Sequence, residues 1–334
     1  MPKNKTYLSI GDFIDLFYKV RQTGYVKLLL KLKASKQSRT LAKWNTKTSS
    51  SDFWIIPEIR KRWNRLATGN ADLEYEDYIM TGYLSGKKGL KMLSVGCGTG
   101  ARERKFAKYP CFSSIEGIDL ASNLIAEARR HASEMNFRNI NYITGDFKTA
   151  RLTFESYDLI LFNSSLHHFY NIEELIQSRI IPLLKNNGLL VIFEYVGPNR
   201  LQCTDFQLAA SNKILKALPL KYKGRFNSNS VKTKIYRPGL IRMFLVDPSE
   251  AVDSEAIIPS IHRHFKIIEE KKLGWDLTWL LFKDIAHNFL QDNKETKQLL
   301  SNIFCMEDEY MKITGRSDAI FGIYKKEAML KDQS

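Results

Sequence analysis

Short apolar runs alternate with amphipathic stretches through the middle of the chain. Runs of about five to seven residues bounded by polar or glycine-containing segments are typical of buried strands, and apolar residues at helical spacing are typical of surface helices. Strands are predicted at 91–95, 115–118, 140–143, 157–162 and 188–194, and helices at 101–108, 122–135 and 171–184. This alternation predicts an α/β fold with a parallel sheet that is covered by helices on both faces.

The regular alternation ends after the strand predicted at 188–194. The next strand-like run is FKIIEE at 265–270, about seventy residues later, which is far longer than an ordinary crossover. Helices near 203–217 and at 250–262 flank a basic stretch in this interval. We therefore expect an inserted cap, followed by apolar helical stretches around 275–305 and a last strand near 319–325.

The N-terminal part has a different pattern. Apolar residues recur at helical spacing within 12–33, among lysines, so this stretch fits either a lid helix that packs on the protein or a helix on an anionic membrane surface. Residues 34–52 are polar and read as a linker, and the aromatic-rich segment 53–88 predicts helices that lead into the main domain.

The net charge of +15 is concentrated in two blocks. Residues 1–50 hold eleven Lys or Arg against Asp12 and Asp15, and residues 200–245 hold ten against Asp205. Such blocks fit an anionic partner, namely nucleic acid, anionic lipid or a phosphorylated substrate, and they equally fit a solvated basic surface.

The four cysteines, at positions 97, 111, 203 and 305, are far apart and form no CxxC pair. This spacing predicts neither a disulfide framework nor a zinc site, so we expect no metal, and it fits a reducing cytoplasm. The start, MPKNKTYLSIGDF, lacks the apolar core of a secretory signal, and no apolar run is long enough to span a membrane. We expect a cytoplasmic protein with peripheral membrane contact as the alternative.

Residues 93–100, LSVGCGTG, place Gly96, Gly98 and Gly100 at the turn from the first strand into a helix. Glycine accepts positive φ and lets the backbone approach a ligand, and amides at a helix start can face a polar group. Asp119 ends the second strand about twenty residues later, where a carboxylate can accept the hydroxyls of a ribose. NAD, FAD and S-adenosylmethionine all fit these features.

Two features separate these ligands. The glycines follow the spacing GxGxG with Ala101 next, rather than the GxGxxG of dinucleotide-binding loops. The segment ITGDF puts Asp146 and Phe147 just beyond the third strand, where an acid can bond the adenine amine and an apolar ring can pack on the base. Both features favour S-adenosylmethionine over a nicotinamide cofactor.

Five segments in this order resemble the class I S-adenosylmethionine-dependent methyltransferases: LSVGCGTG, GIDLASNLIAEAR, YITGDF, YDLILFNSSLHHF and LLKNNGLLVIFEYVGP. The resemblance covers roughly residues 90–198. It implies a Rossmann-like, doubly wound sheet of seven strands, mostly parallel with the last strand antiparallel, and S-adenosylmethionine as cofactor with S-adenosylhomocysteine as product. The expected parts are an N-terminal helical extension at 1–88, the cofactor-binding core at 89–197, a substrate cap at 198–264 and the completion of the sheet at 265–334.

The resemblance also implies roles for individual residues. The glycine loop would face the methionine and ribose, Asp119 the ribose hydroxyls, Leu120 and Phe147 the adenine, and Asn163 the methionine moiety. Many relatives carry an acid at the position of Ser94 that helps to hold the cofactor's ammonium group. The predicted cofactor residues are Ser94, Gly96, Cys97, Gly98, Gly100, Asp119, Leu120, Asp146, Phe147 and Asn163.

On the acceptor side, we expect transfer to an O or N atom of a small-molecule, glycan-linked or lipid-linked acceptor. His168 or Glu194 is the predicted base, if the acceptor needs one. The remaining predicted acceptor-site residues are His167, Tyr195, Tyr236 and Arg237. The segment EYVGPNRLQ and the motifs that follow it resemble a bacterial methyltransferase subgroup associated with glycan and secondary-metabolite pathways.

Three alternatives remain at this point. The basic blocks fit an RNA methyltransferase, although the fourth strand ends FNSS and not in an NPPY-type tetrapeptide. The serine at position 94 fits a non-catalytic protein that keeps the fold as a binding partner. A nicotinamide oxidoreductase is disfavoured by the glycine spacing and by ITGDF.

Overall fold

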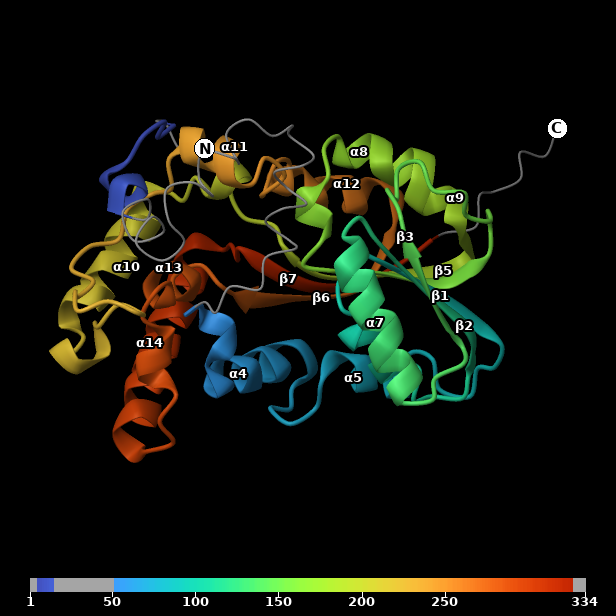
Figure 1. Cartoon of the computed structure of the whole chain (residues 1–334), viewed down its shortest axis with the longest axis horizontal. Helices are drawn as coiled ribbons and strands as arrows, with labels where there is room; N and C mark the ends of the chain where they lie inside the picture. The colour runs from blue at the N-terminus through green and yellow to red at the C-terminus, as the bar shows by residue number, and fades with distance from the viewer. Residues whose placement is uncertain (1–4, 15–50, 327–334) are drawn as a thin grey trace. The chain divides into compact units, whose positions relative to one another are not determined.

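A seven-stranded sheet organises the computed structural model, which describes residues 5–14 and 51–326 (Figure 1). The strands lie in the order β3-β2-β1-β4-β5-β7-β6, mostly parallel with the last strand antiparallel, and helices lie on both sides. The strands are β1 (Leu90–Val95), β2 (Phe112–Asp119), β3 (Ile140–Thr144), β4 (Tyr157–Asn163), β5 (Leu184–Tyr195), β6 (Lys266–Gly274) and β7 (Ala319–Lys325). This confirms the fold class expected from the sequence.

The order of strands creates the edge on which ligands bind in such sheets. β1 pairs with β2 on one side and with β4 on the other, both in parallel, so the chain order reverses beside β1. Crevices outside the carboxyl ends of parallel strands at such a switch point are the usual ligand sites. The glycine loop follows β1, and Asp119 and Asn163 end β2 and β4.

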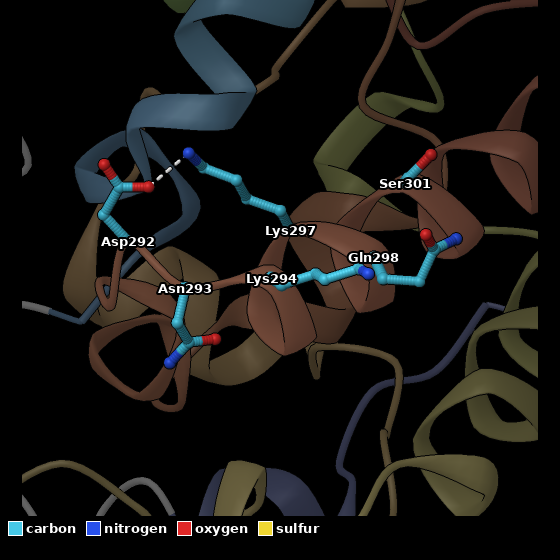
Figure 2. Close-up of a pocket in the computed structure, with 6 residues that line it drawn as sticks. All are labelled: Asp292, Asn293, Lys294, Lys297, Gln298 and Ser301. Carbon is cyan, nitrogen blue, oxygen red and sulfur yellow. Dashed lines mark ion pairs between the residues drawn. The ribbon is translucent and has the colours of Figure 1, made fainter.

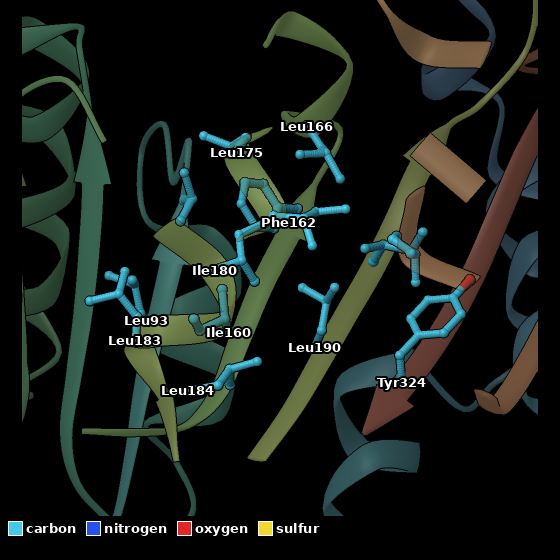
Figure 3. Packing of buried hydrophobic residues seen from close by; sticks show 14 of the residues in the cluster. Leu93, Ile160, Phe162, Leu166, Leu175, Ile180, Leu183, Leu184, Leu190 and Tyr324 are labelled. Carbon is cyan, nitrogen blue, oxygen red and sulfur yellow. The ribbon is translucent and has the colours of Figure 1, made fainter. Parts of the chain in front are cut away.

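Buried apolar side chains fix one face of this sheet. Leu93 of β1, Phe162 of β4 and Leu190 of β5 lie in one cluster, and Figure 3 shows them packed beneath helical residues such as Leu175. Period-2 alternation along each strand points these residues to the same side. Tyr324 of β7 joins the cluster, and its hydroxyl donates to Glu270 at 2.7 Å.

The opposite face carries smaller and more polar residues next to the glycine loop. The register places Ser94 of β1 beside Gly117 of β2, and Gly117 beside Tyr142 of β3. A Cβ on Gly117 would lie 2.8 Å from the Tyr142 ring and 3.0 Å from Cys97 Sγ, so only glycine fits in this row. Helices α6 and α7 pack on this part of the sheet.

The chain divides into two units, each described by itself. The sheet unit consists of 73–196, 252–271 and the described part of 320–334, and the helical unit consists of the described part of 1–72 with 197–251 and 272–319. The sheet unit holds α5 (Tyr75–Gly82), α6 (Ala101–Phe106), α7 (Ser122–Glu134), α8 (Ile172–Leu175), α9 (Ile181–Leu183) and α12 (Ile257–His264). The helical unit holds α4 (Pro57–Thr68), α10 (Asp205–Ala217), α11 (Leu240–Val246), α13 (Thr278–Phe282) and α14 (Lys294–Thr314).

Buried polar groups organise the helical unit. Glu307 of α14 accepts hydrogen bonds from the backbone N–H groups of Leu277 and Thr278, both at 2.9 Å, and so caps the start of α13. Arg62 of α4 pairs with the same carboxylate at 3.5 Å. A buried carboxylate is stable only when donors surround it, so these contacts lock three helices together.

Most of the predicted elements are present, with three differences. The helix predicted at 171–184 is divided into α8, a π-helical segment at Ile176–Ile180 and α9, after which β5 begins earlier than expected. The helix predicted at 250–262 is α12, which begins at Ile257. Helix α11 was not predicted, although its sequence LIRMFLV is apolar except for Arg242 and comes directly after Pro238 and Gly239.

Some predictions fall on residues 15–50, which lie outside the described part of the chain. They include most of the amphipathic stretch at 12–33 and the linker at 34–52. Among the helices of 5–14 and 51–326, none is both long and apolar enough to cross a membrane.

Candidate functional site

All three glycines of the loop after β1 have positive φ, at 71° for Gly96, 54° for Gly98 and 74° for Gly100. Two of them also make close approaches that exclude a side chain. A Cβ on Gly96 would lie 2.5 Å from Ser165 Cβ, and one on Gly100 would lie 2.1 Å from the Tyr142 hydroxyl. Glycine is therefore required by both conformation and space.

Asp119 joins the end of β2 to this loop. One carboxylate oxygen accepts the backbone N–H of Gly98 at 2.9 Å, and the other accepts that of Ala121 at 2.8 Å. Burial raises the pKa of Asp119, and the hydrogen bonds from the backbone of Ala121, Gly98 and Leu120 oppose this shift. Each carboxylate oxygen has two acceptor sites, so Asp119 retains capacity for the two hydroxyls of a ribose.

Asn163 ends β4 and is held by an aromatic residue from α5. The Tyr75 hydroxyl donates to Asn163 Oδ1 at 2.8 Å, which leaves the Asn163 amide NH₂ as the donor that other groups can use. The Tyr75 ring stacks on Phe193 of β5 with centroids 5.2 Å apart. Sequence reasoning missed Tyr75, and its only signal was its place in an aromatic-rich segment.

The variant Tyr75→Phe should therefore affect cofactor binding as well as stability. It removes one neutral hydrogen bond, so the free energy of unfolding should fall by about 1 kcal/mol. Because the Asn163 amide is then no longer held in one orientation, binding of S-adenosylhomocysteine should weaken severalfold. The matched control is Tyr157→Phe, which removes a 2.7 Å hydrogen bond to Glu116 at the amino end of β4. Denaturant titration should show a stability loss in both variants that is at least as large in Tyr157→Phe, because its lost partner is a carboxylate. Calorimetry should show weaker binding in Tyr75→Phe only; weaker binding in both variants would contradict this assignment.

Glu194, near the end of β5, organises the loop after β4. Its Oε2 accepts the backbone N–H groups of Ser165 and Leu166 at 2.8 and 2.7 Å, and its Oε1 accepts Nδ1 of His167. The carboxylate has no exposed surface. Ser165 is thereby fixed in the position where its Cβ faces Gly96, so Glu194 shapes the glycine loop indirectly.

The two histidines lie side by side in the short 3-10 helix Leu166–His168, with ring centroids 4.2 Å apart. His167 is buried and His168 is half-buried. The Tyr195 ring meets His167 edge-on at 6.1 Å. Because Nδ1 of His167 bonds to the carboxylate of Glu194, Nε2 is the ring atom that can accept a proton.

The residues predicted to frame the adenine differ in how deeply they are buried. Asp146 is half-buried, and its Oδ1 accepts the backbone N–H of Lys148 at 2.9 Å. Phe147 is buried in the apolar cluster, with Phe162 and Phe169 edge-on to its ring at 5.9 and 6.0 Å. Leu120 is half-buried. Phe147 thus supports the site from the core, and Leu120 and Asp146 are the members of this group with exposed surface.

Cys97 and Ser94 are the remaining predicted cofactor residues. Burial raises the pKa of the Cys97 thiol well above its usual value, and the charges of Glu103 and Asp119 add to the shift. Cys97 is half-buried, and a protonated thiol in such a place is a packing group and a poor nucleophile. Ser94 is buried on the face of the sheet that α6 covers.

Tyr236 and Arg237, which were predicted to contact the acceptor, belong to the helical unit. The guanidinium of Arg237 is engaged within that unit, since Nε donates to the Cys203 carbonyl at 2.7 Å and another nitrogen pairs with Asp205 at 2.6 Å. Arg237 therefore acts as a structural cross-link there. Tyr236 is half-buried, with the Lys234 ammonium 5.4 Å from the centre of its ring.

A polar pocket of about 480 Å³ also lies in the helical unit, at the start of α14 (Figure 2). Its lining includes an ion pair between Asp292 and Lys297. It contains none of the predicted site residues. The residues that line it are Asp292, Asn293, Lys294, Lys297, Gln298 and Ser301.

Part of the basic block at 200–245 is used inside the helical unit. Lys232 is buried, and its ammonium donates to the carbonyls of Leu280, Leu281 and Lys283 at 2.8 to 3.0 Å. Arg242 pairs with Asp12 at 2.8 Å. Charges that are satisfied internally add little to a surface that would attract nucleic acid, so the block is weaker evidence for an RNA partner than its sequence suggests.

Comparison with known families shows the class of protein. A family model described as "Methyltransferase domain" matches residues 86–256, just over half of the chain. The chain belongs to this methyltransferase family, within the class I S-adenosylmethionine-dependent methyltransferases. The cofactor of this class is S-adenosylmethionine.

Individual relatives match over shorter segments. The chain is 35% identical over 77 residues to the aklanonic acid methyltransferase of Streptomyces sp. (strain C5), which is 22% of this chain and 34% of the relative. It is 28% identical over 129 residues to the malonyl-[acyl-carrier protein] O-methyltransferase of Bacillus cereus, which is 38% of this chain and 46% of the relative. The chain thus spans less than half the length of these curated relatives.

Among solved structures, the chain is similar to the phosphoethanolamine N-methyltransferase 2 of Haemonchus contortus in complex with S-adenosylmethionine. The sequences are 16% identical, the match covers 81% of this chain and 57% of the other, and the TM-score is 0.47.

The residues at the carboxyl edge fit S-adenosylmethionine. Three positive-φ glycines let the backbone approach the ligand, Asp119 offers acceptor sites at the ribose position, and the Asn163 amide is oriented by Tyr75. One feature differs from many relatives, because the acid expected before the first glycine is replaced by Ser94.

Proposed function

We propose that this chain transfers the methyl group of S-adenosylmethionine to an O or N atom of a small-molecule, glycan-linked or lipid-linked acceptor. One observation supports this most strongly: the glycine loop, Asp119, Asn163 and the paired histidines follow the carboxyl ends of β1, β2 and β4 in one parallel sheet. The residues proposed to bind the cofactor and the histidines proposed to accept a proton thus lie at the same edge of the sheet.

The cofactor supplies an activated methyl group on a sulfonium. The protein then has to hold the acceptor in line and exclude water, which can contribute several kcal/mol to lowering the barrier. An acceptor hydroxyl also has to lose its proton, and we assign the role of base to the His167–His168 pair. His168 stays the sequence-based candidate for direct contact, since it is the more exposed of the two rings.

The role of Glu194 is revised by its burial. A carboxylate with no exposed surface and hydrogen bonds from Ser165, Leu166 and His167 is not placed to touch an acceptor. We assign it as a positioning residue that fixes the tautomer of His167. Tyr195, edge-on to His167, would complete the wall on the acceptor side.

The acceptor class is supported by the names of similar proteins, which include an aklanonic acid methyltransferase, a malonyl-[acyl-carrier protein] O-methyltransferase and a ubiquinone biosynthesis O-methyltransferase. The test is transfer of labelled methyl groups from S-adenosylmethionine to fractionated small-molecule, lipid and RNA pools. Label in a small-molecule or lipid fraction that falls in His168→Ala supports the proposal. Label only in RNA, or in no pool despite tight cofactor binding, would contradict it.

A further inference from the structure

Glu103 is a buried acid that neither the sequence motifs nor the mechanism above uses. It lies in α6, directly after the glycine loop, and is 1% exposed. α6 packs against β2, over the face that carries Ser94, Gly117 and Tyr142 in register. The charge of Glu103 raises the pKa of both Cys97 and Tyr142, which places the carboxylate among the residues that support the loop.

This carboxylate lacks the partners that buried acids usually have. Within the described ranges, neither Glu103 oxygen has a hydrogen-bond partner of normal geometry. Burial raises the pKa of Glu103 to about 7, whereas the nearby Ser94 hydroxyl and the charges of Arg104 and Arg102 oppose the shift. Because Arg102 is already bonded to Glu76 at 2.6 Å, it does not neutralise Glu103 fully. An orphaned buried acid of this kind calls for a cationic partner.

The position of Glu103 coincides with the one departure from the family pattern. The resemblance to class I methyltransferases implies an acid at position 94 that helps to hold the cofactor's ammonium group, and this chain has serine there. Ser94 and Glu103 approach each other from β1 and from α6. The two residues are complementary, since the small Ser94 on the strand leaves room for the Glu103 carboxylate that enters from the helix.

We propose that Glu103 supplies from α6 the negative charge that binds the methionine ammonium group of S-adenosylmethionine, with the Ser94 hydroxyl between them. This inference rests on the proposed function, because it requires that the glycine loop holds this cofactor. Glu103 would thus be a positioning residue that acts through Ser94 and supplies the charge that the strand lacks.

The test compares two ligands by calorimetry at pH 8, in wild type and Glu103→Gln. S-adenosylhomocysteine has the ammonium group, whereas 5′-methylthioadenosine shares the adenosine and the thioether but has no amino-acid end. Loss of a charged hydrogen bond should weaken S-adenosylhomocysteine binding about 10- to 100-fold, and 5′-methylthioadenosine binding should be unchanged. Equal losses for both ligands, or no loss for either, would overturn the inference.

A rescue variant separates a charge effect from general damage to the fold. Glu103→Ala combined with Ser94→Asp moves the acid to the strand and should restore most of the affinity lost in Glu103→Ala alone. The matched control is Glu116→Gln on β2, a carboxylate that bonds the Tyr157 hydroxyl and should leave both affinities unchanged. Failure of Ser94→Asp to restore binding in a folded double variant counts against the inference.

The pH dependence gives an independent signature. If binding needs ionised Glu103, with its pKa about 7, wild-type affinity should fall by about tenfold per pH unit below that value. Of the groups around it, Cys97, Tyr142 and Tyr75 stay neutral there because burial raises their pKa values, and Arg102 and Arg104 stay charged. Glu103→Gln should lack this slope. The same slope in both proteins would assign it to another group and overturn the inference.

If wild type binds neither ligand, the proposed function fails and the inference fails with it. If wild type binds S-adenosylhomocysteine and Glu103→Gln binds it equally well, only the inference fails.

Discussion

Glu194→Gln is expected to leave the protein folded and able to bind S-adenosylhomocysteine, but to lower methyl transfer to a hydroxyl acceptor by about 100-fold or more. The amide oxygen can still accept the backbone N–H groups of Ser165 and Leu166. The amide NH₂ instead faces Nδ1 of His167, which must then become the acceptor. The proton moves to Nε2, and the lone pair that could receive the acceptor's proton is lost.

Two measurements check this expectation. Nitrogen NMR of the histidine rings should show His167 protonated on Nδ1 in wild type and on Nε2 in the variant, independently of any acceptor. The free energy of unfolding should fall by about 1–3 kcal/mol, because the N–H groups of Ser165 and Leu166 keep an acceptor, whereas the N–H of Tyr195, which bonds Oε1 at 3.1 Å, loses one.

The matched control is Glu270→Gln, in a second glutamate–histidine pair of the sheet unit. Glu270 bonds His262 at 2.8 Å, and both side chains are partly exposed. This variant should leave both turnover and the His167 tautomer unchanged. A wild-type tautomer in Glu194→Gln, or full turnover with the tautomer reversed, would exclude the positioning role of Glu194.

Gly100→Ala is expected to destabilise the sheet unit and to abolish cofactor binding. Alanine at a φ of 74° costs about 1–2 kcal/mol, and its Cβ would lie 2.1 Å from the Tyr142 hydroxyl. Tyr142 is buried and donates to the Gly100 carbonyl at 3.1 Å, so the loop and the ring must both move. The combined loss should be about 2–5 kcal/mol, since overpacking adds about another 1–3 kcal/mol.

Gly82→Ala is the control for this variant. Gly82 lies at the end of α5 with no positive φ, and its Cβ would meet nothing within 4 Å. This change should be neutral or stabilising by about 0.5–1 kcal/mol. Thermal unfolding and calorimetry should show a large loss in Gly100→Ala alone; equal behaviour of the two variants would show that the loop tolerates a side chain.

The sequence predicted the central strands well because each is a short apolar run buried on both faces. β7 was predicted with its observed bounds for the same reason, since AIFGIYK is a short apolar run. The break at 171–184 was not predictable, because a π-helical turn has the same apolar periodicity as the α-helix around it. α11 was missed because its apolar run has no polar face to mark it as helical.

The candidate site was predictable where a residue follows a strand in a motif, and not where a distant element supplies the partner. Asp119 and the glycines follow from spacing alone. Tyr75 reaches Asn163 from a segment 88 positions earlier, and nothing in either stretch signals the contact. Glu194 was predicted to act on the acceptor because it ends a strand, and its burial under the loop after β4 depends on packing that the sequence does not display.

Calorimetric titration of wild type and Asp119→Ala with S-adenosylhomocysteine decides whether Asp119 and the glycine loop form the cofactor site. Asp119→Asn and the surface variant Asp158→Ala serve as controls, since Asp158 also bonds a backbone N–H, that of Lys91 at 2.8 Å, but lies at the amino end of β4. We predict tight binding in wild type and Asp158→Ala, with at least about a 100-fold loss in Asp119→Ala, because two charge-assisted hydrogen bonds are removed. Absence of binding in wild type, or equal binding in Asp119→Ala, would contradict the account of this loop as the cofactor site.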